Sequence, residues 1–259
     1  MELAVNYERR GSGPDLVLIH SLGADLRLWD EVADAFAARY RILRYDVRGH
    51  GRTTAPYGEV SIDLLRDDLR ALLDELGIAR AHVVGLSMGG MIAQAFAAAH
   101  PDRVTALVLA DTASEFDATI RAAWHERAAT ACRDGMAPLV EPTIARWFPE
   151  AFRRTGAPAL ERVRATIAAM DPRHYAVSGE ALAALDLTAR LGTIRARTLV
   201  GVGAVDAAIP PRFSALIRDR ITGAQLRTWP GVGHCPPLQI AAAFAGDVLA
   251  FLDERSAAR

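Results

Sequence analysis

The feature that most constrains the fold of this chain is a repeated alternation of short apolar runs with amphipathic helical windows. Strands that are apolar along their whole length and separated by helices are typical of a parallel sheet covered on both faces. In the window IDLLRDDLRALLDELGI the leucines share one helical face, and Gly77 predicts where that helix ends. An antiparallel edge strand is expected within 2–11. The other strands are expected at 16–20, 40–46, 81–86, 104–111, 197–206 and 225–231.

The alternation stops at residue 111 and resumes near residue 192. Helical windows punctuated by five prolines fill the segment between them, and no run there has a strand pattern. Ligands of parallel α/β sheets bind where the carboxyl ends of the strands gather. We therefore expect an α/β core made of 1–111 and 192–259, with 112–191 forming a helical cap or lid over that edge.

Composition and charge exclude several classes of protein. The 259 residues are 51% hydrophobic, which is ample for a large core, and the formal net charge of -1 offers no argument for a nucleic-acid or anionic-membrane partner. Cys132 and Cys235 form no disulfide framework, which favours a reducing compartment. The apolar stretches are too short to span a bilayer, and the first residues do not resemble a secretory signal. We expect a cytoplasmic protein with a small-molecule substrate, and its oligomeric state stays open.

Three residues of complementary chemistry follow predicted strand ends. Ser87 stands between Gly85 and Gly89 in the stretch VVGLSMGGMI, and Asp206 and His234 come after two later strands. A G-x-S-x-G turn between a strand and a helix is typical of a nucleophile elbow, in which glycines avoid collisions across a sharp turn. The order Ser, Asp, His is that of hydrolases built on this turn. Because the strand ends share one edge, we predict that the three side chains meet.

Each residue type has a role in acyl transfer. A serine hydroxyl is a weak nucleophile, so His234 would take the proton of Ser87 while Asp206 orients the imidazole. The resulting oxyanion needs fixed donors, for which we predict the backbone N–H groups of Met88 and Leu22, with that of Ser21 as the alternative. His20, at the end of a strand, is interpreted as a brace for the Leu22 loop.

The same motifs also allow other interpretations. Asp111, which precedes the lid, is an alternative to Asp206 as the acid, although the loop GAVDAAIPP before a proline-started helix favours Asp206. The glycine-rich turn 48–51 is interpreted as structural because neither a lysine nor a helix start accompanies it. The chain has no P-loop, complete G-x-G-x-x-G, H-E-x-x-H or Cys/His cluster, so neither a cofactor nor a metal is expected. The remaining histidines are interpreted as surface, packing or lid residues: His50, His82, His100, His125 and His174.

The motifs together resemble the α/β-hydrolase superfamily over nearly the whole chain. The resemblance rests on HSLGADLRLWD, YDVRGHGRT, GLSMGGMIAQAFAAAHPDRV, GAVDAAIPP and GVGHCPPLQ. Within the superfamily the chain is similar to the 3-oxoadipate enol-lactonases, through SLGADLRLWDEV, RILRYDVRGHGRT, GMAPLVEPTIARWFPEAF and AALDLTARLGTIRARTLV. The resemblance implies a mostly parallel eight-stranded sheet with helices on both faces and a helical lid insertion.

The resemblance also implies an activity. It suggests a cofactor-free serine hydrolase that opens a small carboxylated enol-lactone through an acyl-enzyme, during the breakdown of aromatic compounds. The substrate carboxylate would need a cation, for which Arg146 in the lid is the candidate, with Trp147 as an apolar wall or, alternatively, Arg146 as a solvated lid charge. A carboxylesterase or another lactonase of the same fold, and a non-catalytic small-molecule receptor, are the alternatives.

Overall fold

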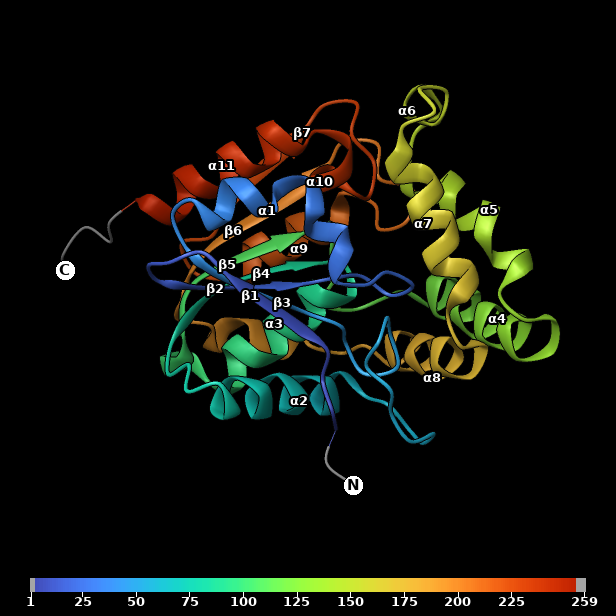
Figure 1. The fold of residues 1–259 in the computed structure, drawn as a ribbon, viewed down its shortest axis with the longest axis horizontal. Coiled ribbons are helices and arrows are strands. Elements are labelled where there is room, and N and C mark those ends of the chain that lie inside the picture. The colour runs from blue at the N-terminus through green and yellow to red at the C-terminus, as the bar shows by residue number, and fades with distance from the viewer. Residues whose placement is uncertain (1–2, 255–259) are drawn as a thin grey trace.

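The computed structural model describes residues 3–254, which form a sheet flanked by helices with a helical lid at one end (Figure 1). The sheet order is β1-β3-β2-β4-β5-β6-β7, in which β1 runs antiparallel to β3 and all other pairs are parallel. The strands are β1 (Tyr7–Arg10), β2 (Asp15–Ile19), β3 (Arg41–Tyr45), β4 (Ala81–Leu86), β5 (Val104–Ala110), β6 (Arg197–Gly203) and β7 (Gln225–Trp229). The predicted fold class is confirmed. The described residues form seven strands and not eight, because the chain has only seven strand-forming runs and residues 3–6 lie outside the sheet.

Helices cover both faces of the sheet. In Figure 1, α1 (Asp30–Ala37) and α11 (Ala241–Asp253) lie together on one face, and α2 (Ile62–Glu75) and α3 (Met88–Ala99) lie on the other. The central strands are therefore shielded on both sides, and the apolar side chains of β2 are fully buried. The remaining core helices are α9 (Arg212–Arg220), α10 (Pro236–Gln239) and the short 3-10 helices η1 (Leu26–Trp29), η2 (Pro101–Arg103) and η3 (Thr188–Thr193).

Helix α2 illustrates how local sequence determines these elements. The side chain of Ser61 accepts a hydrogen bond from the Leu64 N–H and so caps the start of the helix. Gly77, which has a φ of 67°, follows the end, in agreement with the predicted stop. The buried face consists of Ile62, Leu65, Leu69, Leu72 and Leu73.

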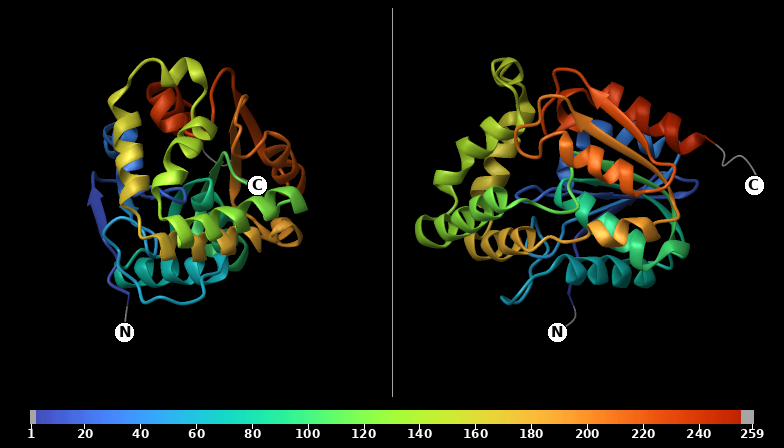
Figure 2. Two further views of the ribbon diagram at one scale, coloured as in Figure 1. Left: turned by 90° about the vertical axis from the view of Figure 1, so that its right-hand side faces the viewer. Right: turned by 180° about the vertical axis from the view of Figure 1, so that it is seen from behind.

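The segment 112–191 contains five helices and stands beside the sheet as a separate layer (Figure 2). An isolated antiparallel bridge between Glu115 and Asp186 joins its two ends at the core, and the predicted boundary near 192 falls inside η3. Four of its five prolines lie at or next to helix starts, whereas Pro142 lies inside α5. None of the helices within 3–254 is long and apolar enough to cross a membrane. The lid helices are α4 (Ala118–Asp134), α5 (Ala137–Trp147), α6 (Glu150–Arg153), α7 (Pro158–Ala169) and α8 (Pro172–Ala183).

Candidate active site

Ser87 occupies the turn between β4 and α3. Its backbone has φ 56° and ψ −117°, and residues other than glycine rarely adopt a positive φ. Two neighbours hold this conformation: the Ser87 N–H donates to the Ala110 carbonyl at 2.9 Å, and the Thr112 hydroxyl donates to the Ser87 carbonyl at 2.7 Å. Backbone strain that is held in this way by the surrounding structure tends to occur at functional sites.

The two glycines that flank Ser87 are required by close packing. A Cβ on Gly85 would lie 2.3 Å from the carbonyl oxygen of Gly89, which is the collision across the turn that the motif predicts. A Cβ on Gly89 would lie 2.1 Å from the carbonyl oxygen of Ile19, at the end of β2. The start of α3 is therefore pressed against the loop that leads to Leu22.

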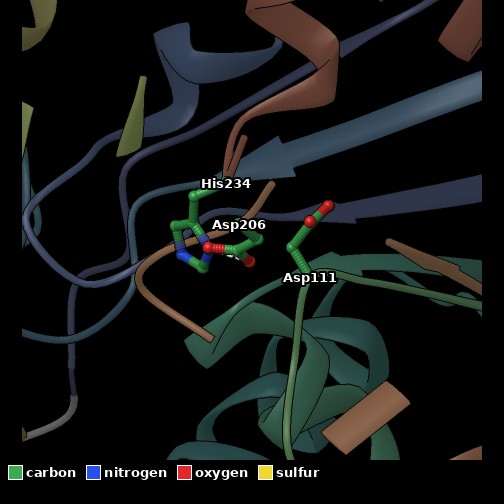
Figure 3. Close-up of side chains that lie close together, drawn as sticks. All are labelled: Asp111, Asp206 and His234. Carbon is green, nitrogen blue, oxygen red and sulfur yellow. Dashed lines mark hydrogen bonds and ion pairs between the residues drawn. The ribbon is translucent and has the colours of Figure 1, made fainter. Parts of the chain in front are cut away.

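His234 and Asp206 form a buried hydrogen-bonded pair. The distance from Nδ1 of His234 to Oδ2 of Asp206 is 2.8 Å, and both side chains are shielded from solvent (Figure 3). The other oxygen of Asp206 accepts the N–H groups of Ala208 at 2.7 Å and Ile209 at 3.0 Å. Because Nδ1 donates to a carboxylate, the free nitrogen of the neutral ring is Nε2, which can act as a base.

The sheet order brings the predicted site residues to one edge. Ser87 follows β4, Asp206 follows β6 and His234 follows β7, and these strands lie in sequence across the sheet with β5 between the first two. Ser87 and His234 retain only 6% and 2% of their accessible surface. The lid contributes to this covering, because the carbonyl of Trp147 accepts the backbone N–H of His234 at 2.8 Å and their rings lie 5.7 Å apart.

Asp111, the alternative acid, lies beside this pair but is bonded differently. Its Oδ1 accepts the backbone N–H of Gly203 at 2.8 Å, and the imidazole of His234 bonds to Asp206. Burial, together with the neighbouring Asp206 carboxylate, raises the pKa of Asp111 well above its usual range. The geometry therefore favours Asp206 as the partner of the base.

One ligand-type atom from each of Asp111, Asp206 and His234 lies within 4.8 Å of the others. Two carboxylates and an imidazole are donors that a divalent cation accepts. Here Nδ1 of His234 and Oδ2 of Asp206 bond to each other, so a cation that used these atoms would have to separate them. The arrangement suits a paired base better than a metal centre.

Of the predicted oxyanion donors, Met88 is the first residue of α3, and Leu22 lies in the loop after β2, against which the start of α3 packs. Among the described residues, no hydrogen bond is formed by the backbone N–H of Met88 or of Leu22. His20 fixes the second loop: its Nε2 accepts the Val47 N–H at 2.9 Å, so Nδ1–H donates to the Ser21 carbonyl at 2.8 Å. Because a trans peptide is planar, holding the Ser21 carbonyl also sets the direction of the Leu22 N–H. Burial lowers the pKa of His20, which keeps the ring neutral for this bracing role.

The lid places two arginines near each other. Arg146 and Arg127 are half-buried, and neither forms a salt bridge with another described residue. Arg146 donates to the Thr143 hydroxyl at 3.1 Å, and Arg127 lies 4.5 Å from the ring centre of Trp124. Burial, and then the positive charge of Arg127, lower the pKa of Arg146 to about 10. Half-buried like charges without a counterion are unfavourable, so this part of the lid is suited to an anion.

Sequence reasoning did not find Arg127. It lies in α4, which the sequence predicts only as a helix of the lid, and the sequence gives no sign of how α4 packs on α5 and α8. The buried ring of Tyr175 connects the two arginines to the oxyanion loop. Burial raises the pKa of Tyr175, and the positive charges of Arg127 and Arg146 oppose this rise. Its Cε2 would lie 3.9 Å from a Cβ on Gly23, next to Leu22.

The fold, and a strained serine at the same sheet edge as a buried His–Asp pair, are those of a hydrolase of the nucleophile-elbow class. The chain matches the α/β hydrolase fold family over residues 14–239 and belongs to that family. This membership confirms the superfamily resemblance seen in the sequence motifs.

Among curated proteins, the chain is 34% identical to 3-oxoadipate enol-lactonase 2 of Acinetobacter baylyi over 207 residues, which covers 79% of this chain and 77% of the relative. It is 31% identical to a putative carbamate hydrolase, RutD, of Caulobacter sp., covering 93% and 91%. Among solved structures, the enol-lactonase from Burkholderia xenovorans LB400 superposes with a TM-score of 0.94 at 34% identity, covering 97% of each chain. These similarities confirm the resemblance to enol-lactonases and the prediction of an ester-hydrolysing enzyme.

Proposed function

We propose that the protein is a serine hydrolase that opens a small carboxylated enol-lactone in the breakdown of aromatic compounds. Ser87 is the nucleophile, His234 the general base and Asp206 its orienting acid. The observation that carries the proposal is the 2.8 Å pair of His234 and Asp206 at the sheet edge where the strained Ser87 turn also lies. The similarity to enol-lactonases supports this choice of substrate.

In the first half-reaction, Oγ of Ser87 attacks the lactone carbonyl while Nε2 of His234 takes the hydroxyl proton. Asp206 stabilises the imidazolium, and the N–H groups of Met88 and Leu22 stabilise the negative oxygen of the tetrahedral intermediate. The ring C–O bond then breaks, and the enol oxygen receives the proton from His234. An enol is more acidic than an ordinary alcohol, so it leaves readily, and its conversion to the ketone prevents ring closure.

In the second half-reaction, water attacks the acyl-enzyme. His234 takes a proton from the water, the bond to Oγ breaks, and the proton returns to Ser87. The product is a keto acid that carries the original carboxylate and the new one. In these two half-reactions, every transferred proton is accounted for by Ser87, His234, the substrate and water.

The substrate carboxylate is held by Arg146, assisted by Arg127, with Trp147 forming an apolar wall next to His234. The support is the pair of half-buried guanidinium groups, which have no acidic partner within residues 3–254 and lie close to Tyr175 and the oxyanion loop. Charge-assisted hydrogen bonds contribute about 1.5–3 kcal/mol each. Arg146→Gln and Arg127→Gln should therefore lower kcat/KM for an anionic lactone by about 10- to 100-fold.

The same two variants should leave hydrolysis of the neutral ester p-nitrophenyl acetate within about twofold of the unaltered enzyme, since no substrate charge is lost. The matched control is Arg133→Gln, which replaces a lid arginine whose side chain is 60% exposed. It should leave kcat/KM unchanged for both substrates. Equal losses for the anionic and the neutral substrate would contradict the assignment of this pair.

Substrate profiling tests the proposed function itself. The purified enzyme is offered an enol-lactone with a free carboxylate, saturated lactones, p-nitrophenyl esters and a carbamate, with Ser87→Ala as the control. Rapid loss of the enol-lactone absorbance, reduced by about 10⁴-fold or more in Ser87→Ala, supports the proposal. Turnover of simple esters or other lactones alone would identify a carboxylesterase or a different lactonase. Preference for the carbamate would favour the activity named for the RutD relatives, and tight binding without turnover would identify a receptor.

A further inference from the structure

A second buried carboxyl group lies beside the catalytic pair, and the mechanism above does not use it. Asp111 is fully buried at the end of β5, next to β6 and the loop that carries Asp206. Figure 3 shows Asp206 beside the imidazole of His234, with Asp111 on the other side of Asp206, and one ligand-type atom from each of the three residues lies within 4.8 Å of the others. Two carboxylates this close in a site closed to water cannot both be ionised without a large cost.

The hydrogen bonds decide which carboxyl carries the charge. Asp206 accepts three donors, from the N–H groups of Ala208 and Ile209 and from Nδ1 of His234. Asp111 accepts one, from Gly203, and its Oδ2 is buried without a partner among the described residues. Donors stabilise the ionised form of a carboxyl group, and an unpartnered buried oxygen disfavours it. Asp206 is therefore the carboxylate, and Asp111 is the group that keeps a proton.

The surrounding charges do not change this assignment. Within 3–254, neither carboxyl forms a salt bridge with an arginine or lysine, and the titratable side chains that face Asp111 are Asp206, His234 and Cys235. Burial and the two carboxyl groups raise the pKa of the Cys235 thiol, so it is uncharged. Among the described residues that face the two carboxyl groups, His234 alone could become positively charged, and its Nδ1 is already bonded to Asp206.

The backbone holds Asp111 in place. Its φ is 46°, and apart from Ser87 it is the only non-glycine residue with a positive φ in the described chain. Its N–H donates to the Gly201 carbonyl at 2.9 Å, while Gly203 donates to its side chain. Both partners lie in β6, shortly before Asp206, so Asp111 ties the end of β5 to the loop that carries the catalytic acid.

We propose that Asp111 is a positioning residue that remains protonated and donates its Oδ2–H to the Asp206 carboxylate, so that the two acids present a single negative charge to His234. The proton stays on Asp111 throughout turnover, and no bond to the substrate is involved. A hydrogen-bond donor on Asp206 disperses the negative charge that this carboxylate presents to His234. This role rests on the proposed function of Ser87, Asp206 and His234.

Two substitutions test the role through the pH dependence of kcat/KM. Asp111→Leu, which removes the donor to Asp206 and the acceptor for Gly203, should raise the apparent pKa of the acid limb by about one unit and lower kcat. Asp111→Asn keeps a neutral donor and an acceptor, so it should restore the acid limb of the unaltered enzyme and most of the rate lost in Asp111→Leu. A loss of more than tenfold in Asp111→Asn would mean that a charged Asp111 is required. If the acid limb of the pH profile of kcat/KM is not shifted in Asp111→Leu, the role of Asp111 is only structural. Either result overturns the proposal.

Infrared difference spectroscopy tests the proton directly and does not depend on the folding of Asp111→Leu. At neutral pH, the spectrum of the enzyme minus that of Asp111→Asn should contain the carbonyl stretch of a protonated carboxylic acid, and Ser87→Ala should retain this band. Its absence overturns the proposal. If the band is present but Ser87→Ala keeps full activity, the proposed function fails while the protonated Asp111 stands.

Discussion

Gly89 packs so closely against β2 that adding a single methyl group to it, as in Gly89→Ala, should lower the catalytic rate. In Gly89→Ala the new Cβ would start 2.1 Å from the carbonyl oxygen of Ile19. Carbon and oxygen in ordinary close contact are about 3.3 Å apart, so the start of α3 must retreat from β2 by about 1.2 Å. Ser87 and Met88 would move with the start of α3, whereas Leu22 would stay with the loop after β2. The two oxyanion donors therefore separate by a comparable distance.

A misplacement of about 1 Å within a catalytic constellation costs about 10²-fold in rate. We expect Gly89→Ala to lower kcat by about this factor with a smaller change in KM, because the lost interaction is made mainly in the transition state. Overpacking should also lower the free energy of unfolding by about 1–3 kcal/mol. Activity is measured with the best substrate from the panel, and stability by urea denaturation.

Gly246→Ala is the matched control, since a Cβ on this residue of α11 meets nothing within 4 Å. It should leave kcat unchanged and raise the free energy of unfolding by about 0.4–1 kcal/mol. The reasoning is refuted if folded Gly89→Ala keeps more than a third of the unaltered kcat, or if Gly246→Ala loses activity to the same extent.

Three further predictions concern the histidines and the acid. Asp206→Asn should lower kcat by about 10⁴-fold, and a loss below tenfold in a single-turnover assay would exclude it as the partner of the base. His20→Ala leaves the Ser21 carbonyl held, among the described residues, only by the Ala24 N–H at 3.2 Å, and should lower kcat by about 10²-fold with KM nearly constant; parallel changes in both constants would contradict its role as a brace. Burial lowers the pKa of His50 to about 3, so this histidine stabilises the fold above about pH 6.5 and loses that contribution as the pH falls toward 3. Between pH 6 and 4, the stability of the unaltered enzyme relative to His50→Gln should fall by about 1.4 kcal/mol per pH unit, and parallel curves would contradict this.

Much of the core could be predicted from the sequence, because each strand is marked by its own residues. Apolar runs bounded by helical windows identify the strands, and a parallel sheet then brings Ser87 and His234 to a common edge whatever the details of packing. The Gly85 turn could likewise be expected, since the collision that it avoids lies within the elbow itself. These inferences depend on neighbours in sequence or on the topology of the sheet.

The features that escaped prediction depend on contacts between distant segments. Gly89 was expected to avoid a collision within the turn, but the atom that its Cβ would meet is the carbonyl oxygen of Ile19 in β2, which the local sequence does not reveal. The closeness of Arg127 to Arg146 likewise follows from how the lid helices pack. Asp111 was visible as an alternative acid, but its proximity to Asp206 and the hydrogen bonds that distinguish the two require coordinates. Pro142 was expected to punctuate the lid, yet it lies inside α5, where tertiary packing tolerates the missing hydrogen bond.

The hydrogen bond from the His234 N–H to the Trp147 carbonyl has a consequence for how substrate preference can diverge. Every residue type offers the same carbonyl, so side chains of α5 can be exchanged without loosening this 2.8 Å attachment of the base. New pockets can thus be built above an unchanged catalytic apparatus by point substitutions in the lid. A lid grafted from another hydrolase that presents no carbonyl at this point should, in contrast, impair turnover of every substrate alike.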